Sequence, residues 1–125
     1  MTDGNDPAVS MADISGNNTP YGSERSYNGL RHVNALAGRE GVSVRVFLMA
    51  DATLCAKTGQ TTPNGYYNLE RMLRGAVRRT VAVGACGSCM DARGLTEGDL
   101  VEGVHRGSME ELTDWTLWAD RTLVY

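Results

Sequence analysis

Two cysteines separated by two residues, Cys86 and Cys89, follow a short apolar run that starts at Val81. The β-branched residues of this run are typical of a buried strand, and residues 90–93 followed by Gly94 are typical of a short helix with a left-handed end. A thiol between the end of a strand and the start of a helix faces N–H groups and a dipole that favour the thiolate, the reactive form of sulfur. The sequence therefore predicts that Cys86 is a nucleophilic sulfur, open to approach because its neighbours are small.

The three thiols leave alternatives open. Cys89 lies one helical turn after Cys86, where it can form a disulfide with Cys86 or resolve a persulfide on it, or can simply fill the contact between helix and sheet. Cys55 follows Leu54 in an apolar patch, a pattern that favours structural filler. A buried structural cysteine is also the alternative for Cys86, but its place at a strand end, its flanking glycines and the second cysteine favour a functional thiol.

Few other residues are placed to assist the cysteines. Asp51 follows another strand, where it can orient a hydrogen bond of the site or cap the backbone. Arg93 suits a bound anion or the thiolate as well as it suits a surface role. His32 and His105 stand alone in the sequence and give no pattern of a base beside a nucleophile.

Composition argues against several classes of function. The chain has 125 residues, enough for one domain, with 12 Lys+Arg against 15 Asp+Glu and a net charge of -3. This balance gives no general attraction to nucleic acid or to an anionic membrane, and one Phe offers no stacking platform for bases. No apolar run approaches the roughly 20 residues of a membrane helix, and no secretory signal is visible. We therefore expect reduced thiols and a cytoplasmic location.

Hydrophobic periodicity predicts strands that alternate with helices. The expected strands cover residues 42–50, 81–86, 100–104 and 122–125, and the expected helices cover residues 24–37, 66–79, 90–93 and 109–119. Tyr66 and Met109 are expected on buried helix faces, and Ser108 with Glu111 has the pattern of a capping box.

This alternation predicts an α/β fold, a single doubly wound parallel sheet with helices on both faces. In such sheets the reactive crevice lies at the carboxyl ends of the strands, so residues 51–55 and 86–89 are expected to converge there.

Five segments between Pro20 and Tyr125 together resemble the DsrE/DsrF-like family, the sulfur-relay proteins that include TusD-like and YchN-like chains. The segments are PYGSERSYNGLR, VRVFLMADATLCAK, PNGYYNLERML, GACGSCMDARG and MEELTDWTLWAD. The resemblance implies a flavodoxin-like α/β fold, assembly into trimers or hexamers, and a cysteine that accepts sulfane sulfur as a persulfide and passes it on. The carrier cysteine of the family matches Cys86, whereas Cys55 and Cys89 are additional thiols present in a subset of such proteins.

One departure from the family concerns residues 1–19. The family has a strand directly before PYGSERSYN, whereas the corresponding residues 8–18 are short of apolar residues and weakly patterned. Either a poor strand forms under tertiary pressure, or this stretch is a flexible tail and the first strand is missing. We therefore divide the chain into residues 1–19, a tail or degenerate first strand, and residues 20–125, the α/β domain.

Three chemistries compete for the cysteines. The first is sulfur relay through a persulfide on Cys86, assisted by Cys89 and Cys55, with a donor and an acceptor protein as partners. The second is dithiol–disulfide exchange or redox sensing by Cys86 and Cys89, although a thioredoxin-type site is disfavoured because all three prolines precede Cys86. The third, a zinc site, lacks a second ligand pair, and no phosphate-binding loop follows a strand, so neither a metal nor a flavin cofactor is expected. Together with the family resemblance, which implies the homo-oligomer and the persulfide, the sequence favours a cytoplasmic, homo-oligomeric sulfur carrier.

Overall fold

The computed structural model describes residues 10–125. The strands are β1 (Ser10–Gly16), β2 (Val42–Leu48), β3 (Ala82–Cys86), β4 (Val104–Gly107) and β5 (Arg121–Val124). The α-helices are α1 (Arg25–Ala37), α2 (Leu69–Arg78), α3 (Gly87–Ala92) and α4 (Met109–Trp118), and two short 3-10 helices are η1 (Ala50–Ala56) and η2 (Glu97–Asp99).

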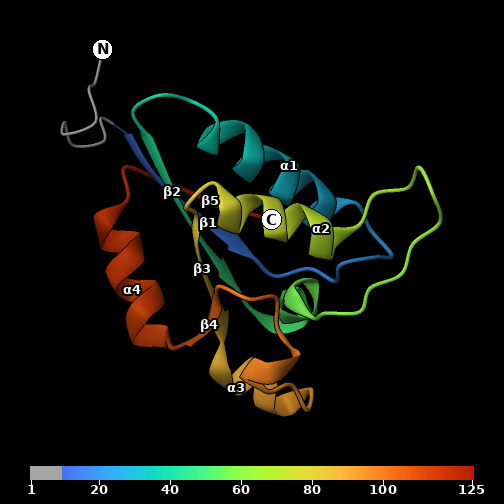
Figure 1. Ribbon diagram of the computed structural model, residues 1–125. Helices are drawn as coiled ribbons and strands as arrows, with labels where there is room; N and C mark the ends of the chain where they lie inside the picture. Colours follow the sequence, from blue (N-terminus) through green and yellow to red (C-terminus); the bar gives the residue numbers. More distant parts are fainter. Residues whose placement is uncertain (1–9) are drawn as a thin grey trace.

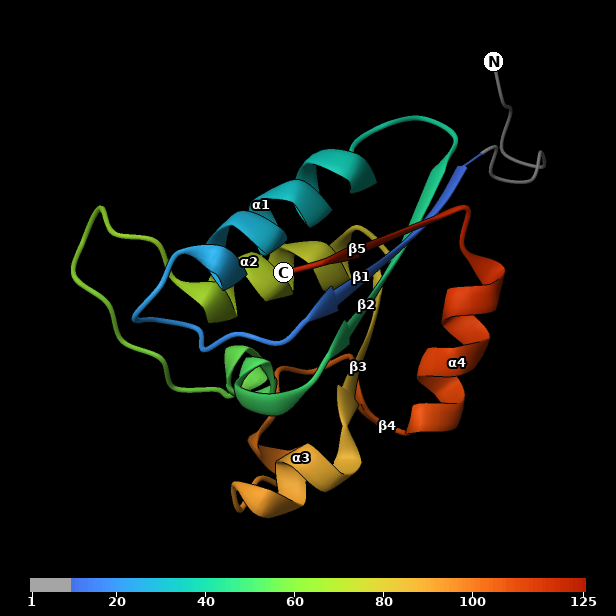
Figure 2. The ribbon, with the colours of Figure 1, turned by 180° about the vertical axis from the view of Figure 1, so that it is seen from behind.

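The strands form one parallel sheet in the order β4-β3-β2-β1-β5. From β1 the chain adds β2, β3 and β4 on one side and then returns to place β5 on the other side of β1, so the sheet is doubly wound. Helices α1 and α2 cover one face and α4 covers the other, while α3 lies beyond the end of β3 (Figure 1 and Figure 2). The predicted α/β fold with helices on both faces is confirmed.

The two faces of the sheet differ in their side chains because residues alternate along each strand. Apolar residues such as Val46 and Val83 point toward α1 and α2 and form the main core. On the face covered by α4 (the α4 face), a smaller cluster contains Phe47, Cys86 and Trp115. The candidate nucleophile therefore lies on the face that α4 covers.

Residues Ser10–Gly16 form strand β1 between β2 and β5, so the alternative of a flexible tail is wrong for these residues. Ile14 packs into the main core, whereas Asp13 and Ser15 are buried on the opposite side of the strand. These two polar residues interrupt the apolar pattern of an internal strand, which forms because it pairs with a neighbour along each edge. Residues 1–9 of the expected tail lie outside the described residues.

Three local predictions from periodicity are wrong. The strand expected at residues 100–104 is instead β4, which begins at Val104. Tyr66 is 67% exposed, since α2 begins only after Asn68, whose side chain accepts a hydrogen bond from the N–H of Arg71 as an N-cap does. Met109 is 61% exposed at the start of α4.

Candidate functional site

The segments that follow β2 and β3 meet beside Cys89. Because the two strands are paired neighbours in a parallel sheet, η1 and α3 start side by side. Arg93 donates from Nε and Nη2 to Oδ1 of Asp51 at 3.0 and 2.9 Å, and from Nη1 to the backbone oxygen of Cys89 at 3.0 Å. The backbone N–H of Ala50 lowers the pKa of the Cys89 thiol, against the larger opposite effect of burial. The predicted convergence is confirmed for Asp51 and Cys89, and Arg93 joins the two segments.

Cys86 is the last residue of β3 and is only 7% exposed. It packs with Phe47 of β2 and Trp115 of α4, whose rings meet edge to face with their centroids 6.0 Å apart. The expectation of an open thiol is therefore wrong, because two large rings fill the space that the small neighbours of Cys86 leave. Cys89 is the more exposed thiol of the pair.

Hydrogen bonds favour the thiolate at Cys86. Burial raises the pKa of Cys86, but hydrogen bonds from the Cys89 thiol, the Ser88 hydroxyl and the backbone N–H groups of both residues outweigh it, so the pKa lies below its usual value. Oγ of Ser88 lies 3.4 Å from Sγ of Cys86. The pKa of Cys89 is raised, first by burial and then by its hydrogen bond to Cys86. Of the two thiols, Cys86 is therefore the one whose ionised form is favoured, and Cys89 is the one whose neutral form is favoured.

Two arginine–aspartate pairs hold α3 in place. Arg106 of β4 binds Asp91 of α3 through two contacts of 2.8 Å. Its guanidinium packs against Gly87, where an added Cβ would lie 2.7 Å from Nε of Arg106. Arg93 and Asp51 form the second pair, on the side of η1. Both pairs are substantially exposed, so they contribute positioning more than stability.

An imidazole–carboxylate pair lies on the α4 face, next to the residues of β3 that lead to Cys86. Nε2 of His105 in β4 lies 2.7 Å from each carboxylate oxygen of Glu111 in α4. His105 pairs with Gly84 of β3, two residues before Cys86, and Cys86 itself pairs with Gly107. The prediction that His105 stands alone is therefore wrong.

Sequence patterns did not predict how Phe47, His105 and Glu111 meet at this site. They belong to different elements, and the strand that carries His105 was expected to end at residue 104. The available signal was the pair of glycines at Gly84 and Gly107, whose missing side chains leave room on two strands for groups from the facing layer.

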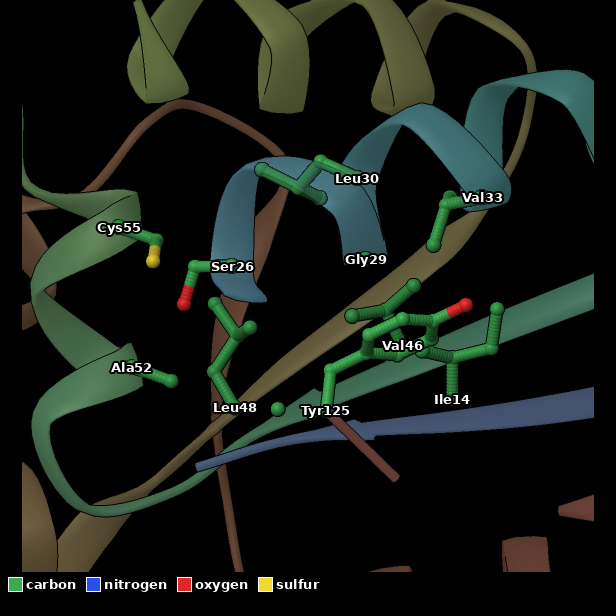
Figure 3. Close-up of a pocket in the computed structure, with 11 residues that line it drawn as sticks. Ile14, Ser26, Gly29, Leu30, Val33, Val46, Leu48, Ala52, Cys55 and Tyr125 are labelled. Carbon is green, nitrogen blue, oxygen red and sulfur yellow. The ribbon is translucent and has the colours of Figure 1, made fainter. Parts of the chain in front are cut away.

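Cys55 lies on the opposite face of the sheet, in the main core, where it is 1% exposed. It lines an apolar cavity of about 20 Å³ together with Ser26 and Tyr125, and Figure 3 shows its sulfur facing the Ser26 hydroxyl. Such a volume holds about one water molecule and no larger substrate. Burial raises the pKa of Cys55 to about 11. The structure therefore does not bring Cys55 together with Cys86 and Cys89.

The described residues bring together thiol and imidazole chemistry. Within residues 10–125, no three His, Cys, Asp or Glu side chains gather into a group that could hold a metal ion. No helix of that range has the length and apolar character needed to cross a membrane. All three cysteines are free thiols, and one of them, Cys86, lies two residues after the strand partner of His105.

Comparison with known proteins gives consistent results. The model of the DsrE/DsrF-like family matches residues 14–125. Protein YchN of Escherichia coli (strain K12) is 40% identical over 113 residues, which cover 90% of this chain and 96% of YchN. The uncharacterised protein MK0008 of Methanopyrus kandleri is 37% identical over 107 residues, which cover 85% of this chain and 86% of that protein. The crystal structure of E. coli YchN is similar to this fold with a TM-score of 0.87 at 38% identity, covering 94% of this chain and 100% of YchN.

Proposed function

Because this chain belongs to the DsrE/DsrF-like family, we propose that it carries sulfur, accepting sulfane sulfur as a persulfide on Cys86 and passing it to an acceptor thiol. The observation that supports this function best is the position of Cys86 at the junction of β3 and α3, where Oγ of Ser88 lies 3.4 Å from its Sγ atom and the groups of Ser88 and Cys89 lower the pKa of Cys86. The thiolate is the form of cysteine that attacks sulfur, so these groups prepare Cys86 for this reaction.

The proposed transfer is balanced without an oxidant or a reductant. The Cys86 thiolate attacks the outer sulfur of a donor persulfide R–S–SH, whose S–S bond breaks and releases the donor as the thiolate R–S⁻. An acceptor thiolate then attacks the outer sulfur of Cys86–S–SH, and Cys86 leaves as a thiolate with the bonding electron pair. A leaving thiol of lower pKa departs faster, so the hydrogen bonds to Cys86 assist the release of sulfur.

Intact-protein mass spectrometry after incubation with inorganic polysulfide tests this function. The wild-type protein and Cys55→Ser are expected to gain about 32 Da, the mass of one sulfur atom, as in persulfidation. Cys86→Ser is expected to remain unmodified, with circular dichroism confirming that it folds. A Cys86→Ser variant that loads sulfur as fast as the wild type would remove Cys86 from the mechanism.

A second candidate is dithiol–disulfide chemistry, which is favoured by the two free thiols that lie three residues apart where β3 ends and α3 begins. The same mass spectra distinguish it, because a disulfide lowers the mass by about 2 Da instead of raising it. Redox sensing would be favoured over sulfur relay if a mild oxidant formed a Cys86–Cys89 disulfide at once and polysulfide formed no persulfide.

We also propose that the protein is a homo-oligomer, a trimer or hexamer, with sulfur donor and acceptor proteins as partners. Helix α4 exposes Met109 and Leu117 to 61% and 81%, and large exposed apolar side chains favour burial against another copy. Sedimentation equilibrium of the 13.5-kDa chain is expected to give three or six times that mass, and a monomer at micromolar concentration would contradict this.

We propose a cytoplasmic location because free thiols persist in a reducing compartment. Cell fractionation followed by thiol trapping tests it.

A further inference from the structure

Two glycines on neighbouring strands make room for the carboxylate of Glu111 beside Cys86. An ideal Cβ on Gly84 would lie 2.8 Å from Oε1 of Glu111, and one on Gly107 would lie 2.6 Å from the same atom. A side chain on either strand residue would displace this oxygen. Gly107 pairs with Cys86, and Gly84 lies two residues before Cys86 on the same face of β3. The Glu111 carboxylate therefore lies over Gly84 and Gly107, the two glycines next to Cys86 on this face of the sheet.

His105 extends this arrangement toward β3. Its Nε2 atom lies 3.2 Å from the position of a Cβ on Gly84, and its ring meets Trp115 edge to face with the centroids 5.9 Å apart. Trp115 also packs with Cys86. Parallel strands lie about 4.8 Å apart and alternate residues of a strand about 6.6 Å apart, so the Cα atoms of His105 and Cys86, which are diagonal neighbours on the sheet, lie about 8 Å apart.

The contacts of Nε2 fix the tautomer of His105. Both oxygens within 2.7 Å of Nε2 are acceptors, so Nε2 carries a hydrogen and donates it to Glu111. In the neutral imidazole the lone pair is then on Nδ1. Among residues 10–125, Nδ1 of His105 has no hydrogen-bond partner, and the side chain is 42% exposed. The ring thus carries a nitrogen with a free lone pair on a side chain that is partly exposed.

We propose that His105, oriented by Glu111, accepts the proton of the thiol that approaches the persulfide on Cys86. This role rests on the proposed sulfur-carrier function and assigns the residue that activates the acceptor. Nδ1 takes the proton from R–SH, and R–S⁻ attacks the outer sulfur of Cys86–S–SH. The S–S bond breaks, Cys86 leaves as the thiolate, and R–S–SH is the product, so atoms and electrons balance with no further reagent.

Other titratable and charged groups surround His105. Glu111 faces it from α4 and Cys86 lies on β3, while Arg45 of β2 places its guanidinium 5.7 Å from the ring centroid of Trp115. On β4 itself, Arg106 is paired with Asp91. A test must therefore compare variants that keep all of these groups and change only the imidazole.

The test measures how fast persulfidated protein loses its added sulfur to N-acetylcysteine amide between pH 6.5 and pH 9, by quenched-flow mass spectrometry. An unperturbed thiol with a pKa of about 8.5 is about 3% ionised at pH 7, so a base that ionises it contributes at most about 30-fold there and about 1.3-fold at pH 9. His105→Gln is therefore expected to transfer sulfur up to about 30-fold more slowly than the wild type at pH 7 and almost equally fast at pH 9.

His32→Gln is the matched control, because His32 bonds to the hydroxyl of Tyr125 at 2.6 Å, away from the cysteine pair. It is expected to transfer sulfur at the wild-type rate at every pH. Glu111→Gln removes the negative charge that fixes the tautomer of His105, so it is expected to show the same pH-dependent loss of transfer rate. This variant provides the test if His105→Gln does not fold.

The outcomes separate this role from the proposed function. A His105→Gln variant that loads and transfers like the wild type overturns the role of His105 and leaves sulfur carriage intact. A loss by the same factor at every pH also overturns it, since a merely structural effect would not depend on the ionisation of the acceptor. A wild-type protein that takes up no sulfur overturns the proposed function and this role with it.

Discussion

Gly107→Ala tests the packing on which the site geometry depends. The added methyl group would lie 2.6 Å from Oε1 of Glu111, 2.6 Å from Cε1 of Phe47 and 3.1 Å from Cζ of Phe47. An ordinary carbon–carbon contact is about 3.5 Å or longer, so the neighbours would have to move by roughly 0.9 Å. Phe47 is fully buried and packs against Trp115, so it has little freedom to withdraw, and the Glu111 carboxylate is displaced from His105.

Overpacking of this kind costs about 1–3 kcal/mol, which corresponds to a fall in Tm of roughly 4–12 °C for a chain of this length. Thermal denaturation followed by circular dichroism measures the change. Gly98→Ala is the control, because Gly98 is exposed and its nearest neighbour to an added Cβ is Oγ1 of Thr96 at an ordinary 3.7 Å. A Gly107→Ala protein that melts within about 1 °C of Gly98→Ala would refute the packing described around Cys86.

Three further predictions concern Cys55, Arg93 and Asp13. Native Cys55 is expected to react with iodoacetamide far more slowly than Cys86 at pH 7.5, because it is 1% exposed and its pKa is raised to about 11; equal rates by peptide mapping would contradict its burial. Arg93→Ala is expected to lower the free energy of unfolding in urea by at most about 1 kcal/mol, since Asp51 is 57% exposed; a loss above about 2 kcal/mol would show that the pair supports the fold itself. Burial raises the pKa of Asp13 above its usual 3.8, against smaller opposing effects of Thr116 and Arg45, so the native state binds this proton at higher pH than the unfolded chain. The stability of the wild type relative to Asp13→Asn is therefore expected to rise as the pH falls from the native pKa toward 3.8, and a pH-independent difference would contradict this.

The sequence predicted the elements that carry regular apolar patterns. Strands were expected at residues 42–50 and 81–86 because β-branched and small apolar residues run together there, and the structure has them at Val42–Leu48 and Ala82–Cys86. The helix expected at residues 66–79 is present as α2 from Leu69 onward, and its Glu70–Arg74 pair, observed at 2.7 Å, has the i,i+4 spacing of the 3.6-residue period. These features depend on residues close in sequence, which is why periodicity is sufficient for them.

The elements that depend on distant partners were predicted less well. Strand β1 places Asp13 and Ser15 on the α4 face, so its sequence lacks the apolar run of an internal strand. The capping box at α4 was half right: Ser108 accepts a hydrogen bond from the N–H of Glu111, but the Glu111 carboxylate bonds to His105 instead of turning back to the N-cap. These polar groups make contacts with residues of other elements, and no local sequence pattern predicts such contacts.

The candidate site shows the same division. The position of Cys86 between a strand and a helix, and the nearness of Cys89, follow from a local pattern and are present in the structure. The cover of Phe47 and Trp115 over Cys86 and the separation of Cys55 follow from which face of the sheet each side chain occupies. A single sequence does not reveal those faces until every strand is placed.

A competition among the three cysteines of the wild-type protein for limiting polysulfide tests most directly whether Cys86 is the sulfur carrier. After loading below one equivalent, free thiols are blocked and peptides are mapped by mass spectrometry. The added sulfur, about 32 Da, is expected first on the peptide that contains Cys86, at its Sγ atom. Sulfur found first on Cys55, or on Cys89 with Cys86 unmodified, would contradict the claim that the lowered pKa of Cys86 selects it as the carrier.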